Sequence, residues 1–294
     1  MTKTAHASRA VLEDACATAG LDATGAEPIR LAENAIWRLP GGKVARIAQP
    51  GQRTTAEREV RVARWLERSH VPVVRALDVQ QPITAAGGHP VTFWQELPPH
   101  TKGTIADVVK LLKHLHALPK PELDLGYLDP FVRVADRIGA AHTVNDDDRQ
   151  WLRDRLEDLK NRWASRPRGL PECVVHGDAW VGNVVATEDG PVMLDLERAS
   201  FGPPEWDLVS TAVKLTTTGA VSAAEYAEFC ETYGTDVTEW EGYELLAGAR
   251  ELRMTTYAAL HAVGRQEWRA EAQHRVDCLR GRAGAPPWKW KGIM

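Results

Sequence analysis

The alternation of apolar and polar residues predicts that the first third of this chain is rich in strands. Residues 29–48 alternate on either side of a Pro-Gly-Gly turn at 40–42, a pattern typical of two antiparallel strands joined by a tight connection. A second strand pair is predicted over 74–97, where an Ala-Gly-Gly turn at 86–88 divides the apolar residues. Together these segments predict a small sheet.

Two helices are predicted within the same third. Residues 7–20 form an alanine-rich segment that ends in a glycine, the residue most favoured just past a helix C-terminus. The second helix follows the first strand pair. Thr54 and Glu57 have the spacing of a capping box at its start, and Pro72 is expected to end it.

The pattern becomes helical after the proline pair at 98–99. Thr104 precedes a run of isoleucine, valine and leucine at three- and four-residue spacing, which predicts an amphipathic helix. Residues 145–163 predict another helix, with three aspartates at its positive N-terminal end. The chain beyond residue 204 also has a largely helical pattern.

This change of pattern predicts a two-lobe α+β fold. The N-terminal lobe, residues 1–97, is expected to be a small mixed β-sheet lobe with a leading helix, and residues 98–294 a larger, mostly helical lobe. The hinge between them is expected at about residues 94–102. A chain of 294 residues is long enough for two lobes with a substantial buried core.

Composition narrows the classes of protein to which this chain can belong. A formal net charge of −4 and a pI near 6.2 argue against a protein that binds nucleic acid. The four cysteines lie far apart and include no CxxC pair, which indicates free thiols in a reducing compartment. No segment is long and apolar enough to span a bilayer, and no signal peptide is recognisable. We expect a soluble cytoplasmic protein, a monomer or homodimer, that acts without nucleic acid or membrane.

The most informative segment is His-Gly-Asp at 176–178, followed by Asn183 and Asp195. Two apolar runs separate Asn183 from Asp195, and Glu-Asp-Gly at 188–190 between these runs is a strong hairpin signal. Because the middle of this turn is equidistant from both residues, we predict that they lie directly opposite each other at the open end of a hairpin. Asp178 precedes the hairpin and is expected near the same end.

Three converging oxygen-bearing side chains could bind a hard cation and accept a proton. Asn183 and Asp195 would lie about 5 Å apart, close enough to share one Mg²⁺ ion. Asp178, a carboxylate not needed for the metal, would be placed to accept a proton from an attacking hydroxyl group. Asp and Asn are also common at turns and strand ends, which is the structural alternative. Their convergence beside a His-Gly-Asp loop favours the chemical interpretation.

The spacing His-Gly-Asp, four residues, Asn, then Asp after a hairpin resembles the motif of the aminoglycoside phosphotransferase family, small-molecule kinases related to choline and fructosamine kinases. The resemblance extends from about Leu31 to the tryptophan-rich C-terminus. It implies a protein-kinase-like two-lobe fold with ATP and Mg²⁺ as cofactors. It also implies that Asp178 is the catalytic base and that Asn183 and Asp195 bind the Mg²⁺ ions that bridge the ATP phosphates.

The same resemblance gives roles to neighbouring residues. His176 is expected to support the catalytic loop by packing and hydrogen bonding. Asp207, within a Gly-x-x-x-x-Asp-Leu sequence, is expected to brace this loop. Glu197 has two interpretations, a further metal contact or a solvated side chain, and we favour the solvated side chain.

In the N-terminal lobe, Val-Ala-Arg-Ile at 44–47 resembles the strand that carries the phosphate-binding cation of the family. The resemblance implies that Val44 covers the adenine and that Arg46 binds the phosphates, since residues i and i+2 share one face of a strand. Glu59, on the following helix, is expected to pair with Arg46. Glu57 is the alternative partner, and a solvated helix face is the alternative environment for Glu59.

Residues 93–97 resemble the hinge of the family, which implies that backbone groups of Gln95 and Leu97 bind the edge of the adenine. The chain departs from the related pattern at two places. Arg46 stands where protein kinases have a lysine, and the expected nucleotide loop at 31–35 contains no glycine. These departures concern nucleotide affinity and preference more than the type of reaction.

We therefore expect an ATP- and Mg²⁺-dependent phosphotransferase that moves the γ-phosphate of ATP to a hydroxyl group of a small molecule. An aminoglycoside or other antibiotic, as in antibiotic resistance, would suit the carboxylates of the second lobe, which are Glu205, Asp236, Glu239, Glu241, Glu244 and Glu251. Alternatives are a sugar or choline-like metabolite, the latter held by tryptophan faces, and a catalytically degenerate homologue that binds nucleotide or ligand. A metal-dependent phosphoester hydrolase is a further alternative.

Overall fold

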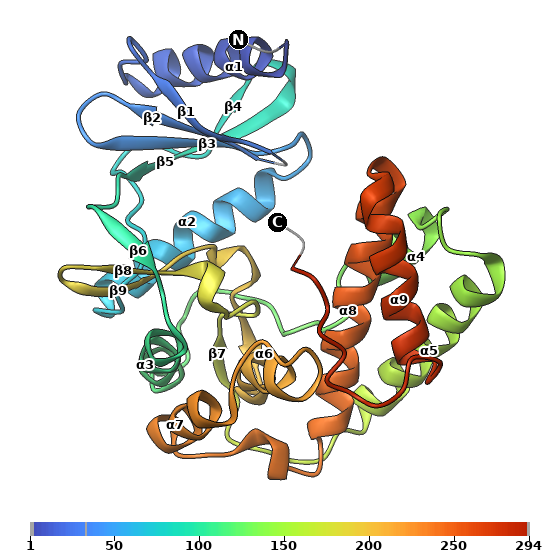
Figure 1. The fold of residues 1–294 in the computed structure, drawn as a ribbon. Coiled ribbons are helices and arrows are strands. Elements are labelled where there is room, and N and C mark those ends of the chain that lie inside the picture. The colour runs from blue at the N-terminus through green and yellow to red at the C-terminus, as the bar shows by residue number, and fades with distance from the viewer. Residues whose placement is uncertain (1–2, 33, 293–294) are drawn as a thin grey trace. The chain divides into compact units, whose positions relative to one another are not determined.

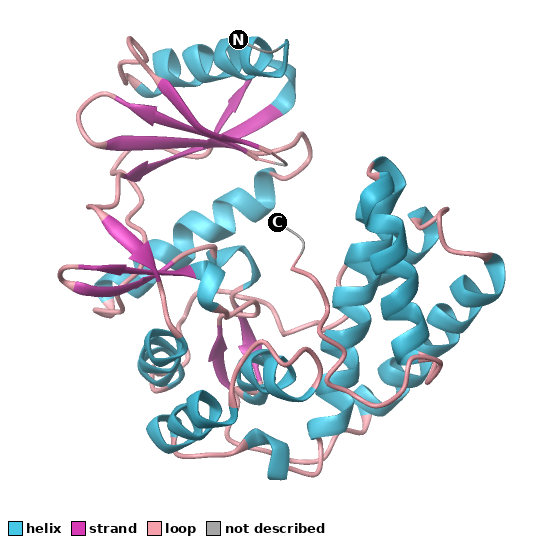
Figure 2. Cartoon of the chain, viewed as in Figure 1, coloured by secondary structure: helices cyan, strands magenta, loops and turns pink. Residues whose placement is uncertain are grey.

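The computed structural model describes residues 3–32 and 34–292, which belong to two compact units. Unit 1 consists of Met1–Leu125 and Val181–Ala199, and unit 2 of Gly126–Trp180 and Ser200–Met294. Figures 1 and 2 show their helices and strands. The predicted α+β composition is confirmed, since the first hundred residues contain a sheet with two helices and helices dominate after residue 204. The lobe boundary predicted at 94–102 falls within unit 1 and stays a prediction.

Unit 1 contains a five-stranded antiparallel sheet of order β1-β2-β3-β5-β4. Its strands are β1 (Glu27–Leu31), β2 (Ala35–Leu39), β3 (Lys43–Ile47), β4 (Ile83–Ala85) and β5 (His89–Gln95). The first predicted pair is therefore three strands, because β1 and β2 pair with each other before the Pro-Gly-Gly turn joins β2 to β3. The second predicted pair is confirmed as β4 and β5, although β4 is much shorter than expected.

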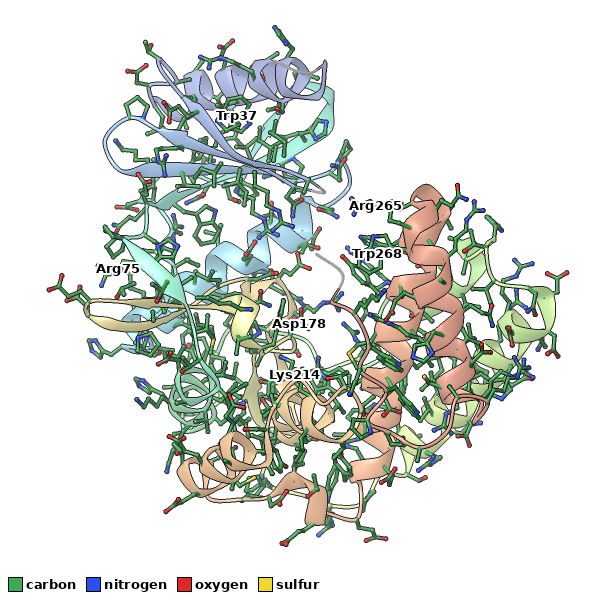
Figure 3. All side chains as sticks on the ribbon, viewed as in Figure 1. Trp37, Arg75, Asp178, Lys214, Arg265 and Trp268 are labelled. Carbon is green, nitrogen blue, oxygen red and sulfur yellow. The ribbon has the colours of Figure 1, made fainter. Side chains whose placement is uncertain are left out.

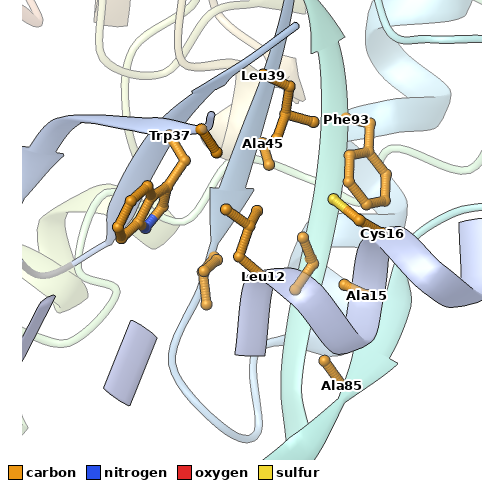
Figure 4. Close-up of a cluster of buried hydrophobic side chains, with 11 residues drawn as sticks. Leu12, Ala15, Cys16, Trp37, Leu39, Ala45, Ala85 and Phe93 are labelled. Carbon is orange, nitrogen blue, oxygen red and sulfur yellow. The ribbon is translucent and has the colours of Figure 1, made fainter. Parts of the chain in front are cut away.

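Helix α1 (Lys3–Ala19) covers one face of this sheet (Figures 1 and 4). Leu12 and Cys16, one helical turn apart, pack with Trp37 of β2 and Phe93 of β5 in a buried cluster. The helix ends where predicted, because Gly20 has a φ of +68°, a left-handed conformation that glycine adopts readily. Since this face is the hydrophobic core, the alternate residues of each strand project from the opposite face.

Helix α2 (Arg53–Arg68) follows β3 and buries its apolar residues together with the charged residue Glu59. The capping box predicted at its start is wrong. The helix begins one residue before Thr54, and its N-cap, Gln52, makes no side-chain capping bond. Pro72 does not end the helix either, because helical structure stops at Arg68.

A second antiparallel sheet of unit 1, of order β6-β8-β9, contains the predicted hairpin. The elements in this part of the unit are β6 (His100–Lys102), α3 (Ile105–His116), β8 (Val184–Thr187) and β9 (Gly190–Met193). Gly103 donates its N–H to the carbonyl oxygen of Val184 at 2.9 Å, and a Cβ on it would lie 2.6 Å from the Val184 side chain. A larger residue would therefore separate β6 from β8. Helix α3 begins at the predicted residue, since Thr104 and Asp107 form a complete capping box.

Unit 2 is built around α8 (Tyr243–Gly264), which is buried along much of its length because other helices pack against it. Those helices are α4 (Val134–Ala140), α5 (Asp146–Ala164), α6 (Glu205–Thr216) and α9 (Arg269–Leu279), and α7 (Ala223–Tyr233) packs against α6. Strands β7 (Cys173–Val175) and β10 (Ser200–Gly202) form a short antiparallel pair. The helix predicted over 145–163 is confirmed as α5, with Asn145 as its N-cap.

In the part of the chain that the structure describes, no helix combines the length and apolar composition needed to cross a membrane. The four cysteines are free thiols, as predicted. Burial raises the pKa of Cys16 to about 11 and that of Cys173 to about 12. These two thiols are therefore packing residues rather than nucleophiles.

Candidate active site

The cation predicted to bind phosphate lies on the face of the sheet away from α1. Ala45 and Ile47 are buried in the core covered by α1, so Val44 and Arg46 project from the opposite face. Nη1 of Arg46 donates to both carboxylate oxygens of Glu59, each at 2.6 Å. The predicted ion pair between Arg46 and Glu59 is therefore present.

A second carboxylate also contacts this arginine. Nη2 of Arg46 donates to Glu197 at 3.3 Å, and the Glu197 side chain is only 25% exposed. The interpretation of Glu197 as a solvated side chain is therefore wrong, because the short 3₁₀ helix η3 (Leu196–Arg198) brings it within reach of β3. Glu57, the alternative partner for Arg46, instead pairs with Arg53 on the surface of α2.

Charge is unevenly balanced around Arg46. Burial, opposed by the charge of Arg46 and assisted by the carboxylates of Asp195 and Glu197, raises the pKa of Glu59 to about 7. Burial acts to lower the pKa of Arg46, but the same three carboxylates outweigh it and raise this pKa above its usual value. The group formed by Glu59, Asp195, Glu197 and Arg46 thus contains three carboxylates and one guanidinium, so negative charge is in excess.

The predicted hairpin is formed by β8 and β9, with Thr187 paired to Gly190 across a two-residue turn. Beyond its open end, the N–H of Leu194 donates to the carbonyl oxygen of Asn183 at 2.9 Å. The residue opposite Asn183 is therefore Leu194, and the predicted direct opposition of Asn183 and Asp195 is wrong by one position. The error arises because the turn contains two residues and not three.

Asp195 lies where the chain leaves the extended conformation of β9. Its φ of +56° is a left-handed conformation that Asp tolerates better than most residues. Its charge raises the pKa of both Glu59 and Arg46, so its carboxylate lies close to their ion pair. Asn183, the last residue of the short helix η2 (Val181–Asn183), belongs to the same unit.

These residues fit the requirements of a magnesium site. Mg²⁺ prefers oxygen ligands and usually takes only one or two from a protein, keeping its other positions for phosphate and water. Asn183 and Asp195 have oxygen atoms of this kind, and the excess negative charge near Asp195 is one that a cation would neutralise. Among the residues described, no three His, Cys, Asp or Glu side chains form a metal-binding group. The metal-binding role of Asn183 and Asp195 stays a prediction.

The residues whose backbone groups are predicted to bind the edge of the adenine lie at the end of β5 and just beyond it. Gln95 is the last residue of β5, and its N–H donates to the carbonyl oxygen of Arg75 at 2.8 Å. A contact between Gln95 and adenine would therefore use its carbonyl oxygen. Leu97 follows in the connection to β6, and Glu96 between them donates its N–H to the β2–β3 turn at 2.8 Å. The adenine-binding roles of Gln95, Leu97 and Val44 stay predictions.

In unit 2, the loop that follows β7 carries the His-Gly-Asp sequence. Asp207 of α6 accepts the N–H groups of His176 at 2.6 Å and Gly177 at 2.9 Å, so the predicted bracing contacts are present. Nδ1 of the buried His176 accepts the N–H of Asp178 at 3.2 Å. Gly177 has a φ of +83°, which a residue with a side chain would adopt only with strain. These bonds fix the backbone from which the Asp178 side chain projects.

An arginine without a predicted role contacts Asp178, which is labelled in Figure 3. Nη1 of Arg250, on α8, donates to Oδ1 of Asp178 at 3.4 Å. Arg250 also lies 3.9 Å from the ring centroid of Trp206, whose Nε1 donates to the carbonyl oxygen of Gly177 at 2.9 Å. The signal in the sequence is weak, a charged residue directly after the apolar Leu-Ala-Gly-Ala segment at 246–249.

Most of the predicted site residues belong to unit 1. They are Val44, Arg46, Glu59, Gln95, Leu97, Asn183 and Asp195. Asp178 belongs to unit 2, although only four residues separate it from Asn183 in the sequence. Unit 1 thus has a cation for phosphate and oxygen ligands for a divalent metal, while unit 2 has a braced carboxylate able to accept a proton.

Comparison with known proteins identifies a family over most of the chain. The sequence profile of the phosphotransferase enzyme family matches residues 26–246. A search of curated proteins returns no match. The matched segment includes every predicted catalytic, nucleotide-binding and metal-binding residue, and the resemblance inferred from the sequence is confirmed.

Solved structures with the same fold cover most of the chain. A choline/ethanolamine kinase family protein from Mesorhizobium loti has a TM-score of 0.66 at 18% identity, over 97% of this chain and 96% of that one. A choline kinase from Streptococcus pneumoniae has a TM-score of 0.65 at 14% identity, over 95% and 99%. An aminoglycoside phosphotransferase from Streptomyces rimosus has a TM-score of 0.60 at 20% identity, over 85% and 99%. The likeness confirms the predicted kinase-like fold.

Proposed function

Because the chain belongs to the phosphotransferase enzyme family, we propose that it transfers the γ-phosphate of ATP to a hydroxyl group of a small molecule. The observation that carries this proposal is the Arg46–Glu59 ion pair with the charge of Asp195 close to it. Two structures with the same fold contain an adenine nucleotide. The Streptomyces rimosus enzyme has been solved with ADP and streptomycin, and the Streptococcus pneumoniae choline kinase with AMP. They support ATP as the phosphate donor of this chain.

Arg46 is proposed to bind the ATP phosphates. Its guanidinium donates to Glu59 at 2.6 Å and to Glu197 at 3.3 Å. Phosphate oxygens would compete best for the longer contact, because charge-assisted hydrogen bonds weaken as they lengthen. Glu59 would meanwhile keep the guanidinium oriented.

The other nucleotide contacts follow from residues of the same unit. Asn183 and Asp195 would hold Mg²⁺, which when bound neutralises negative charge on the phosphates. Val44, beside Arg46 on the same face of β3, would cover the adenine ring. Backbone groups of Gln95 and Leu97 would bind the polar edge of that ring.

Asp178 is proposed to act as the catalytic base. Its carboxylate would accept the proton of the acceptor hydroxyl as the hydroxyl oxygen bonds to the γ-phosphorus. The bond between that phosphorus and the β-phosphate oxygen breaks in the same step, and ADP is released without a phosphoenzyme. The Asp178 side chain is 40% exposed, so a small molecule can reach it.

The carboxylates of unit 2 bear on the choice of acceptor. Of the six that could bind a polycation, three accept hydrogen bonds within the unit. Glu205 accepts a backbone N–H, Asp236 the hydroxyl of a tyrosine and Glu251 that of a threonine. The other three are exposed and lie around the start of α8. This favours an acceptor with few positive charges, such as a sugar or a choline-like alcohol, over a polycationic aminoglycoside.

We place the reaction in the cytoplasm. The four cysteines are free thiols, which suits a reducing compartment, and ATP is available there. All the proposed site residues belong to one chain, so either a monomer or a homodimer could be active.

The test is release of ADP from Mg·ATP across a panel of aminoglycosides, other antibiotics, sugars, amino sugars and choline-like alcohols. Asp178→Asn is measured beside the wild type. Asp189→Asn, in the exposed turn of the hairpin, makes the same charge change and serves as the control. We expect turnover that requires an acceptor, that survives in the control and that falls by at least about 100-fold in Asp178→Asn.

The alternatives predict different results. A catalytically degenerate homologue would bind ATP but show no turnover with any acceptor. A metal-dependent phosphoester hydrolase would release phosphate without an acceptor, and Arg46→Ala would change its rate little. The absence of ATP binding would overturn the proposal.

A further inference from the structure

A buried arginine contacts one oxygen of the Asp178 carboxylate. Arg250 lies in the N-terminal half of α8, and its side chain is 6% exposed, whereas that of Asp178 is 40% exposed. Nη1 of Arg250 donates to Oδ1 of Asp178 at 3.4 Å. The contact connects a buried helix with the partly exposed residue that the proposed function needs as a base.

The guanidinium of Arg250 is also fixed by groups other than Asp178. Its Nη2 donates to the carbonyl oxygens of Trp206 at 2.9 Å and Gly177 at 3.4 Å. The guanidinium carbon lies 3.9 Å from the Trp206 ring centroid, a favourable cation–π geometry. Because these contacts do not depend on the charge of Asp178, the guanidinium stays in place when the carboxylate gains a proton.

We propose that Arg250 is a positioning residue that orients Asp178 for proton abstraction, an inference that rests on the proposed kinase function. The charge of Arg250 attracts Oδ1 through this 3.4 Å contact and so favours one orientation of the carboxylate, in which Oδ2 is the oxygen that accepts the proton of the acceptor hydroxyl. The hydroxyl oxygen then bonds to the γ-phosphorus, and ADP leaves with the electrons of the broken bond. Orientation matters because a misplacement of about 1 Å can lower a rate by about 100-fold.

A second buried arginine of unit 2 has a similar set of partners and provides a matched control. The Arg275 side chain, on α9, is also 6% exposed, lies 5.1 Å from the Trp290 ring centroid and donates to Glu271 at 2.8 Å. It further donates to the backbone carbonyl oxygens of Met254, at 3.0 Å, and Lys291. Its carboxylate partner is buried and lies outside the proposed site. Replacing Arg275 therefore removes similar packing and bonding without affecting the base.

The experiment compares Arg250→Met, Arg250→Lys and Arg275→Met with an acceptor identified in the ADP-release panel. We expect Arg250→Met to lower kcat by about 100-fold while KM for ATP changes by less than about threefold. Arg250→Lys keeps a charge near Trp206 and Asp178 and should recover part of this loss. Arg275→Met should retain kcat within about twofold although its melting temperature falls as far as that of Arg250→Met.

Two kinetic results would overturn the positioning role. One is a kcat of Arg250→Met equal to that of the wild type. The other is an equal loss of kcat in Arg275→Met, which would mean that any damage to the packing of unit 2 has the same effect. If Arg250→Met does not fold, Arg250→Lys replaces it in the comparison. An unchanged kcat in Arg250→Lys, together with an unchanged ¹³C signal of Asp178 in the experiment below, would also overturn the role.

A spectroscopic measurement tests the contact without any acceptor. In protein labelled with ¹³C at the aspartate carboxyl carbons, the Asp178 signal is assigned by its absence in Asp178→Asn. We expect this signal to shift in the Arg250 variants and to stay in place in Arg275→Met. If the wild type phosphorylates no acceptor, the proposed function fails. A signal that stays in place in the Arg250 variants overturns the positioning role separately.

Discussion

Each unit contains a buried carboxylate beside an arginine, and the pKa values of these two carboxylates shift in opposite directions. In unit 1, Glu59 is 4% exposed, and burial, opposed by Arg46 and assisted by two carboxylates, raises its pKa to about 7. In unit 2, Asp148 is fully buried. Burial acts to raise the pKa of Asp148, but hydrogen bonds from its neighbours outweigh it and hold this pKa below its usual value.

The contrast comes from the number of donors around each carboxylate. Asp148, in the first turn of α5, accepts hydrogen bonds from the side chains of Arg280, Arg282, Gln273 and Asn145. The protein therefore supplies every partner itself, and the network joins the start of α5 to α9 and the segment after it. Such a network has a structural task.

Glu59 has a different environment, because it shares a single arginine with Glu197 while the charge of Asp195 acts on both partners. Adding a divalent cation near Asp195 and phosphate groups near Arg46 would balance these charges. An unbalanced buried network thus points to a ligand, whereas a balanced one points to stability.

The largest expected effect on this comparison is that of Asp195→Asn. If Asp195 holds Mg²⁺, its replacement by a neutral amide should lower kcat by about 1,000-fold and raise the Mg²⁺ concentration needed for half-maximal activity. The measurement is a Mg²⁺ titration of ADP release. Asp189→Asn, in the exposed turn of the same hairpin, should behave as the wild type. Full activity in Asp195→Asn would contradict the proposal that Asp195 holds Mg²⁺ in unit 1.

The next effect is that of Arg46→Ala. Loss of the guanidinium removes charge-assisted hydrogen bonds to the phosphates, so kcat/KM for ATP should fall by about 100-fold or more. Arg53→Ala is the control, because Arg53 is an exposed arginine of the same unit that pairs with Glu57 on α2. An equal loss in both variants would mean that general charge, and not the Arg46–Glu59 pair, attracts the nucleotide.

Much of the fold could be predicted because its signals are local. A two-residue period along β3 is enough to direct Ala45 and Ile47 into the core and Arg46 to the opposite face. Thr104 marked the start of α3 correctly, whereas Thr54, which has the spacing of a capping box with Glu57, did not mark the start of α2. The start of α2 depends on where the chain leaves β3, which local spacing does not reveal.

The errors in the candidate site have a related cause. The spacing of Asn183 and Asp195 located the hairpin, but the register depends on a turn that is one residue shorter than expected. Glu197 lies 151 residues from Arg46, and Arg250 lies 72 residues from Asp178. Contacts between residues so far apart in the sequence depend on tertiary packing, so periodicity and motif spacing could not predict them.

A smaller effect, this time on stability alone, is expected from Asp148→Asn in the balanced network. Loss of the carboxylate removes the buried partner of Arg280 and Arg282, although both still contact Asp147, and should lower the free energy of unfolding by about 3 kcal/mol. Activity at temperatures where the variant stays folded should be unchanged. Urea unfolding measures the difference, and Asp146→Asn, at a 91% exposed side chain in the same turn, is the control.

This stability difference should also depend on pH. Because the pKa of Asp148 is lowered in the folded state, its contribution is present above the usual pKa of an aspartate and is lost as pH falls through the folded-state pKa. Wild type and Asp148→Asn should therefore converge in stability only in strong acid. Convergence near neutral pH would contradict the balanced network.

The contribution of Glu59 to stability, measured as the difference between the wild type and Glu59→Gln, should depend on pH in the opposite direction from that of Asp148. The pKa of Glu59 is raised from 4.5 to about 7, so the folded state binds this proton more tightly than the unfolded state does. The contribution of Glu59 to stability is therefore fully present below pH 4.5 and is lost as pH rises through about 7. Over that window the wild type without nucleotide should lose about 3 kcal/mol that Glu59→Gln does not lose.

The measurement is urea unfolding of the wild type, Glu59→Gln and Glu57→Gln between pH 4.5 and 8. Glu57 is 40% exposed on the same helix and pairs with Arg53, so Glu57→Gln should keep the slope of the wild type. If Glu59→Gln also keeps that slope, Arg46 neutralises Glu59 completely and unit 1 is as balanced as the network around Asp148. The excess of negative charge would then no longer support a cation site beside Asp195, although the phosphate-binding role of Arg46 would stand.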